Sequence, residues 1–348
     1  MNFERRAQTL EIQQEQPSQQ ISSIPPQLPP TLLEGLSHFV RQLPSWLFAL
    51  LSLIAVFFTY QFIGGGLTLL LFGMDPGANE VAAYRWATML GQILFLLVPT
   101  IILAKLRFPS VKNIFRFGPF NVKEILLVLV AVLTLQQLLQ GYLTVQDSIP
   151  ITFPPVVQKL IDQVKEMMEE MYRMLTLAHS LPEFLFVVLV IAATPAVCEE
   201  LLFRGLIQRT LGDDGATSVD AASRQTISRG LAAAVLSGVI FAGYHLNPFT
   251  LIPLAVLGIY FGFVVYRTQN IVTSMAAHFF NNFLACLAVY LNLDDNFMAI
   301  APTEQPSTAI QVVNYSVCAV VFIAATYYLV RSTNHNHKES AQHVQQVP

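Results

Sequence analysis

Charged side chains are the scarcest feature of this sequence. Asp, Glu, Lys and Arg make up 12% of its 348 residues, about half of the roughly 25% found in ordinary soluble domains. Hydrophobic residues make up 54%, a composition that excludes an ordinary soluble domain and indicates a membrane protein. The net charge of -3 is small and spread along the chain, so nothing predicts nucleic acid as a partner. The partner that the composition predicts is the lipid bilayer.

Cysteine is scarce as well. The chain has three cysteines, Cys198, Cys286 and Cys318, and all of them lie in apolar segments. An odd number of cysteines at such positions gives no disulfide framework. We expect them to act as small buried hydrophobic residues.

The first 43 residues have little apolar surface to bury. They include the polar run Gln13–Gln20 and the proline-rich run Pro25–Pro30. Segments of this composition cannot offset the entropy lost on ordering. We therefore expect residues 1–43 to form a disordered cytoplasmic tail.

Long apolar runs fill most of the remaining chain. A run of about 20 apolar residues is long enough to cross the bilayer core as a helix. The predicted spans are residues 46–72, 86–104, 125–143, 184–207, 231–245, 249–266, 271–289 and 309–330. The sequence thus predicts an all-α polytopic membrane bundle of about eight transmembrane helices.

Residues 155–178, between the third and fourth spans, have a different pattern. Apolar residues such as Leu160, Val164 and Met171 recur at helical spacing with charged residues between them, which is typical of an amphipathic helix. Its basic and acidic residues nearly cancel, so attraction to anionic lipid explains it poorly. We expect this helix to cap the bundle or to pack as a lid.

The loops predict how the chain is oriented in the membrane. With the N-terminus inside, the cytoplasmic segments hold 14 Lys and Arg residues and the opposite segments hold 4. Cytoplasmic loops carry the excess of positive residues in membrane proteins. The count predicts that both termini are cytoplasmic and that Glu199 lies toward the cytoplasmic face.

Two adjacent carboxylates end the fourth span. Charges kept in a membrane helix usually face a cavity and mark a functional site. On a helix, Glu200 and Arg204 are four residues apart with the acid first, which favours an ion pair. Glu199 points about a quarter turn away and is left free for chemistry. Taken alone, the same residues are also typical of a solvated, salt-bridged helix end.

Two histidines and an amide lie in other apolar spans. His278 and Asn282 are four residues apart, so they share one face of a helix, and His245 ends another span. Each histidine alone is equally typical of a hydrogen-bonded packing residue. Together with Glu199 they could meet in one internal polar cavity. A carboxylate base, imidazoles and a neutral donor are the groups that proton transfer and oxyanion binding require.

These residues carry a resemblance to a known family. EELLFR at 199–204, FAGYH at 241–245 and HFFNN at 278–282 resemble the EExxxR, FxxxH and HxxxN motifs of the CAAX protease and bacteriocin-processing family, also called the Abi family, of intramembrane peptidases. The three motifs occur in the family's order on successive predicted helices.

The resemblance implies roles for the motif residues. Glu199 and His245 would activate the attacking water, and His278 and Asn282 would stabilise the oxyanion, with Glu200 and Arg204 completing the site. The resemblance also implies a peptide or protein substrate and a cavity open to the membrane. It divides the chain into the tail 1–43, N-terminal helices and the amphipathic helix at 44–180, a catalytic core at 181–292, and a last span with a polar tail at 293–348.

The need for a metal stays open at this point. Glu199, His245 and His278 could hold a divalent, zinc-like ion or could act on water without one. Two other functions also stay open. The same polar residues could form a relay in a small-solute transporter, or the chain could be a non-catalytic immunity or scaffold protein. Transporters often contain paired broken helices from an internal repeat, and no such repeat is seen, which favours the enzyme.

Overall fold

The structure is a computed structural model that describes residues 32–73, 76–77, 79–150, 153–212, 224–293 and 308–345. All regular elements within these ranges are helices, which confirms the predicted all-α class. Several long helices contain a π-helical segment, labelled η.

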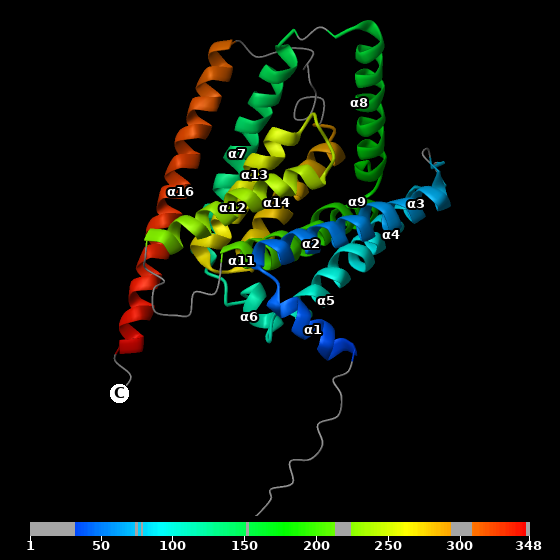
Figure 1. The fold of residues 1–348 in the computed structure, drawn as a ribbon. Coiled ribbons are helices and arrows are strands. Elements are labelled where there is room, and N and C mark those ends of the chain that lie inside the picture. The colour runs from blue at the N-terminus through cyan, green and yellow to red at the C-terminus, as the bar shows by residue number, and fades with distance from the viewer. Residues whose placement is uncertain are drawn as a thin grey trace, which may run out of the picture.

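Figure 1 labels most of the α-helices, and the full order of elements along the chain follows here. They are α1 (Leu32–Gln42), α2 (Ser45–Phe57), η1 (Phe58–Gly64), α3 (Gly65–Phe72), α4 (Val81–Gln92), η2 (Ile93–Leu97), α5 (Val98–Arg107), α6 (Val111–Phe115), α7 (Val122–Ser148), α8 (Pro155–Thr176), α9 (Leu181–Val187), η3 (Val188–Ala193), α10 (Thr194–Glu200), η4 (Leu201–Ile207), α11 (Gln208–Gly212), α12 (Arg224–Tyr244), α13 (Leu251–Thr268), α14 (Ile271–Tyr290) and α16 (Thr308–Gln345).

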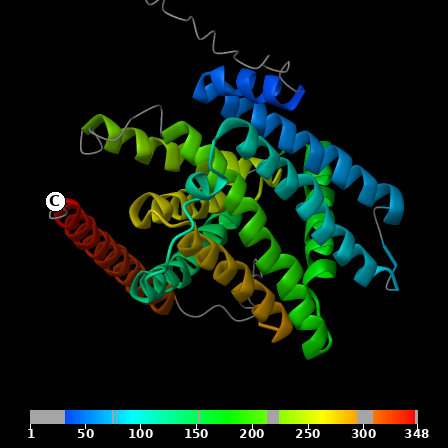
Figure 2. The ribbon, with the colours of Figure 1, turned by 90° about the horizontal axis from the view of Figure 1, so that it is seen from below.

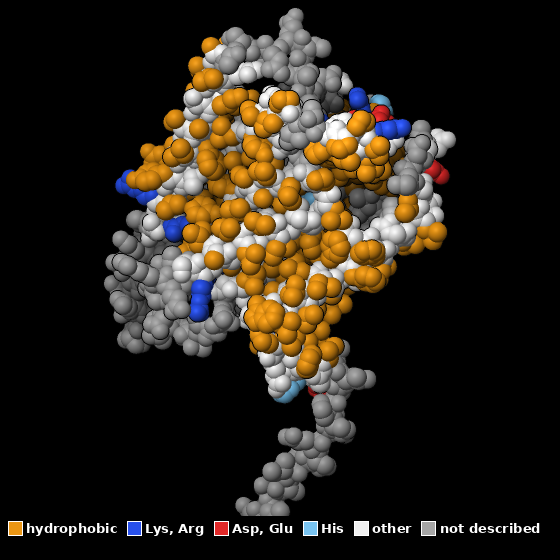
Figure 3. Space-filling model, turned by 45° about the horizontal axis from the view of Figure 1, so that its top comes forward, with side chains coloured by type: hydrophobic (Ala, Val, Ile, Leu, Met, Phe, Trp, Pro, Cys, Tyr) orange, Lys and Arg blue, Asp and Glu red, His pale blue; other side chains and the backbone are white. Residues whose placement is uncertain are grey.

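Seven helices in the described ranges are long and apolar enough to cross a membrane. Seven of the predicted spans correspond to them, whereas the span predicted at 231–245 falls in α12. The apolar part of α12, Ser228–Tyr244, is shorter than the others and lies at the lower limit of the roughly 17–25 residues that cross a bilayer core. The count of eight therefore becomes seven long helices and one short one. Figure 3 shows hydrophobic side chains over most of one face of the molecule, as a lipid-facing surface requires.

Part of the segment expected to be disordered is helical. Residues 32–42 form α1, which packs against α5. Ser37 Oγ donates to the carbonyl of Leu106, and the Arg107 guanidinium binds the carbonyls of Val40 and Leu43. The bonds from Arg107 satisfy carbonyls at the C-terminal end of α1, and the bond from Ser37 satisfies one at the C-terminal end of α5. Residues 1–31 lie outside the described residues.

The helix that runs from α9 to α11 is the centre of the bundle. In Figure 2 it passes between the α2–α5 helices and α13–α14, and its η4 segment is buried at every position. α7 and α16 pack side by side at the periphery. The central helix carries Glu199, Glu200 and Arg204, so the packing surrounds these residues with protein.

Small residues let α12 and α13 cross closely. A Cβ atom added to Gly238 would lie 2.3 Å from the backbone nitrogen of Ile259, and one added to Gly262 would lie 2.9 Å from the carbonyl oxygen of Ala234. Small residues four apart on two facing helices are a common device for close packing in membranes. The carbonyls of Gly258 and Gly262 accept hydrogen bonds from Arg204 and Gln208 on the central helix. The close crossing thus holds α13 against the site.

The amphipathic helix was expected at residues 155–178, and α8 occupies most of that range. One buried residue on α4, Arg85, fixes its C-terminal end by donating to the carbonyls of Met174, Leu175 and Leu177. Its Nη1 lies 2.7 Å from Oε1 of Glu183 on α9. Near the other end, Val156 and Leu160 are exposed. α8 is therefore held at its C-terminal end, and Lys165 near its middle lies 3.6 Å from Asp147 on α7. It lies at the edge of the bundle (Figure 1), and its role as a cap or lid stays a prediction.

Candidate active site

Glu199 and Glu200 lie at the junction of α10 and η4 and have contrasting surroundings. Consecutive residues on a helix point about 100° apart, which turns the two carboxylates toward different neighbours. The Glu200 side chain has no exposed surface, whereas the Glu199 side chain is 13% exposed. The junction itself is a change from α to π geometry, a feature found frequently at functional sites.

Glu200 is fully partnered, as the predicted ion pair requires. Arg204 Nη1 lies 2.8 Å from its Oε1, Ser274 Oγ donates to its Oε2, and His278 Nδ1 lies 3.0 Å from its Oε1. Arg204 also lies over the ring of Phe241, with 4.6 Å between the guanidinium carbon and the ring centroid. A buried ion pair is stable only when further hydrogen bonds accompany it. Ser274, His278 and the carbonyl of Gly258 supply such bonds here, whereas the Arg204 Nε has no partner in the described part of the chain.

The two histidines present the same ring atom to Glu199. His278 donates through Nδ1 to the Glu200 carboxylate, because an ionised carboxylate can only accept. His245 donates through Nδ1 to the carbonyl oxygen of Phe241, 2.8 Å away. Whenever either ring is neutral, its Nε2 is then the acceptor. Phe261 stacks on the His278 ring and Phe241 contacts both rings, which fixes their orientation.

Three acceptor atoms therefore converge at one place. Glu199 Oε2 lies 4.0 Å from His245 Nε2 and 3.9 Å from His278 Nε2. This oxygen is buried and has no hydrogen-bond partner in the described part of the chain. An arrangement of a carboxylate and two imidazole nitrogens suits a group that donates protons, such as a water molecule. The structure thus brings together three of the predicted residues, which come from α10, α14 and the end of α12.

The same three side chains, Glu199, His245 and His278, were the candidate metal ligands. Zinc takes such ligands at about 2.0–2.2 Å, which in a tetrahedral site places donor atoms about 3.4 Å apart. The separations of 3.9 and 4.0 Å are longer. Within the described ranges, no group of three or more His, Cys, Asp and Glu side chains is arranged to hold a metal ion. The ligand types suit zinc, but their spacing is not that of a metal-bound set.

Asn282 has a partner that the sequence did not suggest. Its Nδ2 donates to the carbonyl of Ile191, 3.0 Å away. Ile191 lies in the π-helical segment η3, and Pro195, four residues further on, has no N–H that could bind this carbonyl in α-helical register. Asn282 thus supplies a donor to a carbonyl that cannot bind residue 195, and one of its two N–H donors is used there. Its Oδ1 accepts from Asn281.

Ser274 is a site residue that the motifs did not include. It lies four residues before His278, so both share one face of α14, and it is fully buried. That spacing was the available signal. Without the partner helix there was no reason to choose Ser274 over other small polar residues.

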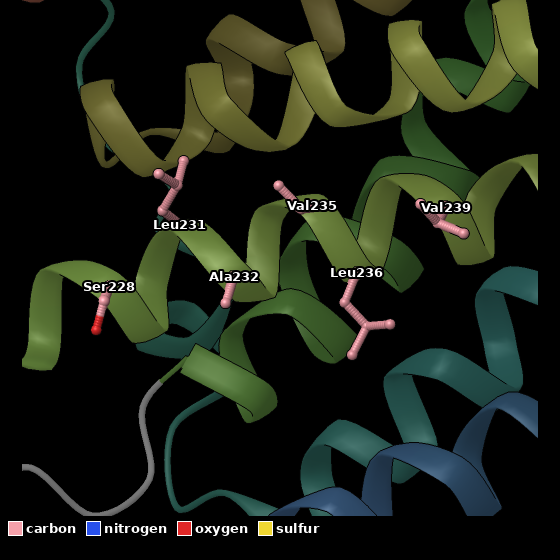
Figure 4. Close-up of a pocket in the computed structure, with 6 residues that line it drawn as sticks. All are labelled: Ser228, Leu231, Ala232, Val235, Leu236 and Val239. Atoms are coloured by element: carbon pink, nitrogen blue, oxygen red, sulfur yellow. The ribbon is translucent and has the colours of Figure 1, made fainter.

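An open groove on the surface of α12 lies apart from these residues. It has a volume of about 500 Å³ and is lined by Ser228, Leu231, Ala232, Val235, Leu236 and Val239 (Figure 4). None of the predicted site residues lines it. The groove is apolar, as expected of a helix face that contacts lipid, and the internal polar cavity stays a prediction.

The comparisons with known proteins agree with the motifs. Residues 181–284 match the family model described as type II CAAX prenyl endopeptidase Rce1-like. The predicted resemblance to the CAAX protease and bacteriocin-processing family is thereby confirmed for this segment. The matched segment holds the central helix from α9 to α11, α12, α13 and most of α14, and all six predicted site residues. No curated protein and no solved structure matches the chain.

Proposed function

We propose that this chain is an intramembrane endopeptidase that hydrolyses a peptide bond of a membrane-associated protein or peptide. The convergence of Glu199, His245 and His278 within the matched segment is the observation that carries the proposal. Glu200 and Arg204 act through His278. The Glu200 carboxylate of this buried pair binds Nδ1 of the His278 ring and so directs Nε2 of the same ring toward Glu199.

In the proposed reaction, water is held between Glu199 and His245 and gives its proton to the Glu199 carboxylate. The water oxygen then bonds to the scissile carbonyl carbon, and the carbonyl electron pair moves to the carbonyl oxygen. When that intermediate collapses, the C–N bond breaks and the proton is delivered to the leaving amine. The second N–H of Asn282 stabilises the oxyanion. His278 does so as well when its ring enters the reaction with both nitrogens protonated, and it keeps both protons throughout.

The substrate would approach past His245. Its side chain is 33% exposed, compared with 13% for Glu199 and 4% for His278. The reacting atoms would therefore be reached from the His245 side, where α12 ends. A membrane-associated substrate suits a site that lies within apolar helices.

We propose the metal-free form of this reaction. The Glu199 oxygen lies farther from the ring nitrogens of His245 and His278 than it would if all three bound one zinc ion. If instead an ion is required, Glu199, His245 and His278 would hold it. A chelator should leave the activity unchanged, and purified protein should contain no stoichiometric metal. Loss of both ion and activity on chelation, with metal retained by wild type but not by His245→Ala, would replace this form with a metal-dependent one.

The proposed function is tested by cleavage of a defined peptide. The probe is an internally quenched peptide ending in a farnesylated CAAX sequence, offered to purified protein in detergent and in vesicles, with the unfarnesylated peptide alongside. A proteomic comparison of membranes containing wild type or Glu199→Gln identifies other substrates. Cleavage by wild type alone supports the proposal. Absence of wild-type cleavage in both experiments rejects it in favour of a transporter or a non-catalytic immunity or scaffold protein.

A further inference from the structure

His245 follows the last residue of α12, whereas Glu199 and His278 lie inside helices. The amides of His245 and Leu246 each donate to the carbonyl three residues earlier, at 3.2 Å, which tightens the last turn of the helix. Leu246 then adopts a φ of 51°, a left-handed conformation that helix ends usually assign to glycine. A bulky residue keeps such a backbone only where the surrounding structure holds it. Contacts from other elements must therefore hold this turn.

Gln61 on η1 contacts the start of the turn. Its Nε2 donates to the carbonyl of Tyr244 at 3.1 Å. The last carbonyls of a helix have no partner in the helix itself, so this bond satisfies a group that the end of α12 leaves open. The Tyr244 hydroxyl donates to the carbonyl of Leu53 on α2 at 2.6 Å, and its ring packs edge-on against Phe57. The α2–η1 helix thus holds the backbone directly before His245.

Gln146, near the end of α7, contacts the other end of the turn. Its Nε2 donates to the carbonyl of Phe249 at 3.0 Å. The amide of Phe249 donates to Oδ1 of Asn247 at 3.0 Å, a local bond typical of turns. The backbone on either side of His245 is therefore bound by a glutamine side chain. Both glutamines lie outside the matched segment, residues 181–284.

The position of this turn matters because His245 holds the attacking water in the proposed reaction. The bond from its Nδ1 to the carbonyl of Phe241 fixes the ring relative to α12 only. The distance of 4.0 Å between its Nε2 and Glu199 Oε2 depends on where the end of α12 lies relative to α10. A displacement of about 1 Å at a reacting group can lower the rate about 10²-fold.

We propose that Gln61 and Gln146 are positioning residues that hold the turn after α12, so that Nε2 of His245 stays within reach of the attacking water. They act through the backbone on either side of His245 and not by contact with the substrate. The inference rests on the proposed endopeptidase function. It extends the site to η1 and α7, two elements outside the matched segment.

The test is to remove each amide donor with Gln61→Leu and Gln146→Leu, which keep much of the side-chain volume. We expect each variant to lower kcat about 10-fold and the double variant to lower it about 10²-fold. KM should stay within a few-fold, because the reach of His245 affects the chemical step more than substrate binding. The internally quenched peptide that tests the proposed function provides both constants.

The matched controls lie two residues before each glutamine. Thr59→Val removes a hydroxyl that donates to the carbonyl of Phe95 on η2 at 2.8 Å. Thr144→Val removes a hydroxyl that donates to the carbonyl of Gln140, within α7, at 3.1 Å. Each control removes a donor from the same helix as its glutamine, but neither of these bonds reaches the turn. Both should keep kcat close to that of wild type.

Amide hydrogen exchange, measured without substrate, reports on the turn itself. We expect faster exchange through residues 244–250 in both leucine variants and unchanged exchange in both valine variants. Wild-type exchange or wild-type kcat in the leucine variants would overturn the inference and leave the endopeptidase function intact. A loss confined to KM, or equal kcat losses in the leucine and valine variants, would do the same. Failure of wild type to cleave any peptide rejects the proposed function itself, so the two failures are distinguishable.

Discussion

Glu199 and Glu200 are neighbours in the chain, but their side chains should respond differently to substitution. Glu200→Gln leaves the buried Arg204 charge without its partner, and breaking such a pair typically costs about 3–5 kcal/mol. Glu199 has no comparable partner and is partly exposed. We expect Glu200→Gln and Arg204→Ala to lower folded yield and thermal stability, and Glu199→Gln to fold like wild type.

Thermal unfolding in detergent, followed by fluorescence, measures this difference. Glu169→Gln on the exposed surface of α8 is a matched control for removing one carboxylate charge. Equal stability of the Glu199→Gln and Glu200→Gln proteins would contradict the separation of roles between the two acids.

Asn282 is expected to have two separable effects. Asn282→Ala should lower kcat by about 10²–10³ if its second N–H contacts the oxyanion. It should also lower stability, because the carbonyl of Ile191 loses its donor. Pro195→Ala supplies a backbone N–H that can reach this carbonyl, so the stability loss should be smaller in the double variant than the single variants predict.

A double-mutant cycle of thermal stabilities measures that coupling, and kcat is measured on the same proteins. Restored stability with kcat still low would separate the structural role of Asn282 from its catalytic one. Additive stability losses would show that Asn282 does not compensate for Pro195.

At the scale of the elements, the crossing of α12 and α13 should be sensitive to a single methyl group. Gly238→Ala places a Cβ atom 2.3 Å from the backbone of Ile259, so the two helices must separate. Separation draws the carbonyl of Gly258 away from Arg204. We expect a large loss of folded protein and of activity. Gly243→Ala on the same helix is the control, because its Cβ atom would meet nothing within 4 Å.

Size-exclusion profiles and thermal unfolding of the two alanine variants provide the comparison. If Gly238→Ala were as stable as Gly243→Ala, close approach of the helices would not be what holds α13 at the site.

The contacts of Arg85 with the C-terminal end of α8 give a second prediction at the scale of the elements. Arg85→Ala removes the donor that binds three carbonyls at the end of α8 and leaves Glu183 without its ion pair. We expect faster amide hydrogen exchange through residues 170–180 and easier proteolysis between α8 and α9. Arg173→Ala on exposed α8 surface is the control. Unchanged exchange in the Arg85→Ala protein would show that other contacts hold this end of α8.

The elements and the site were predictable from the sequence to different degrees. Apolar runs predicted the seven long apolar helices, and helical spacing predicted α8 and the Glu200–Arg204 pair, because all of these depend on local pattern. The π-helical segments, the anchoring of α8 by Arg85 and the contact of Asn282 with Ile191 depend on which helices meet, and a local pattern carries no such information.

For the whole molecule, the orientation in the membrane stays a prediction from the loop charges. Cysteine introduced at Lys112 should be labelled from the cytoplasmic side only, and cysteine at Lys159 from the opposite side only. Both lysines are exposed, and the native Cys198, Cys286 and Cys318 are buried, so background labelling should be low. The reverse pattern would overturn the predicted topology.

The number of crossings can be measured in the same cells. If α12 crosses the membrane despite its short apolar length, the total is even and tags on both termini report the same side. If the seven long helices alone cross, the tags report opposite sides. We expect the same side, because the positive loop residues on both flanks of the chain favour a cytoplasmic location.

Direct attack by water activated at Glu199 can be observed in a single turnover carried out in heavy-oxygen water. The product and the enzyme peptide that contains Glu199 are then analysed by mass spectrometry, with Glu199→Gln as the inactive control. We predict one heavy oxygen in the new carboxyl terminus of the product and none in the Glu199 side chain. Heavy oxygen in the Glu199 carboxylate would indicate a covalent acyl intermediate, and cleavage by Glu199→Gln at the wild-type rate would show that this carboxylate is not the base.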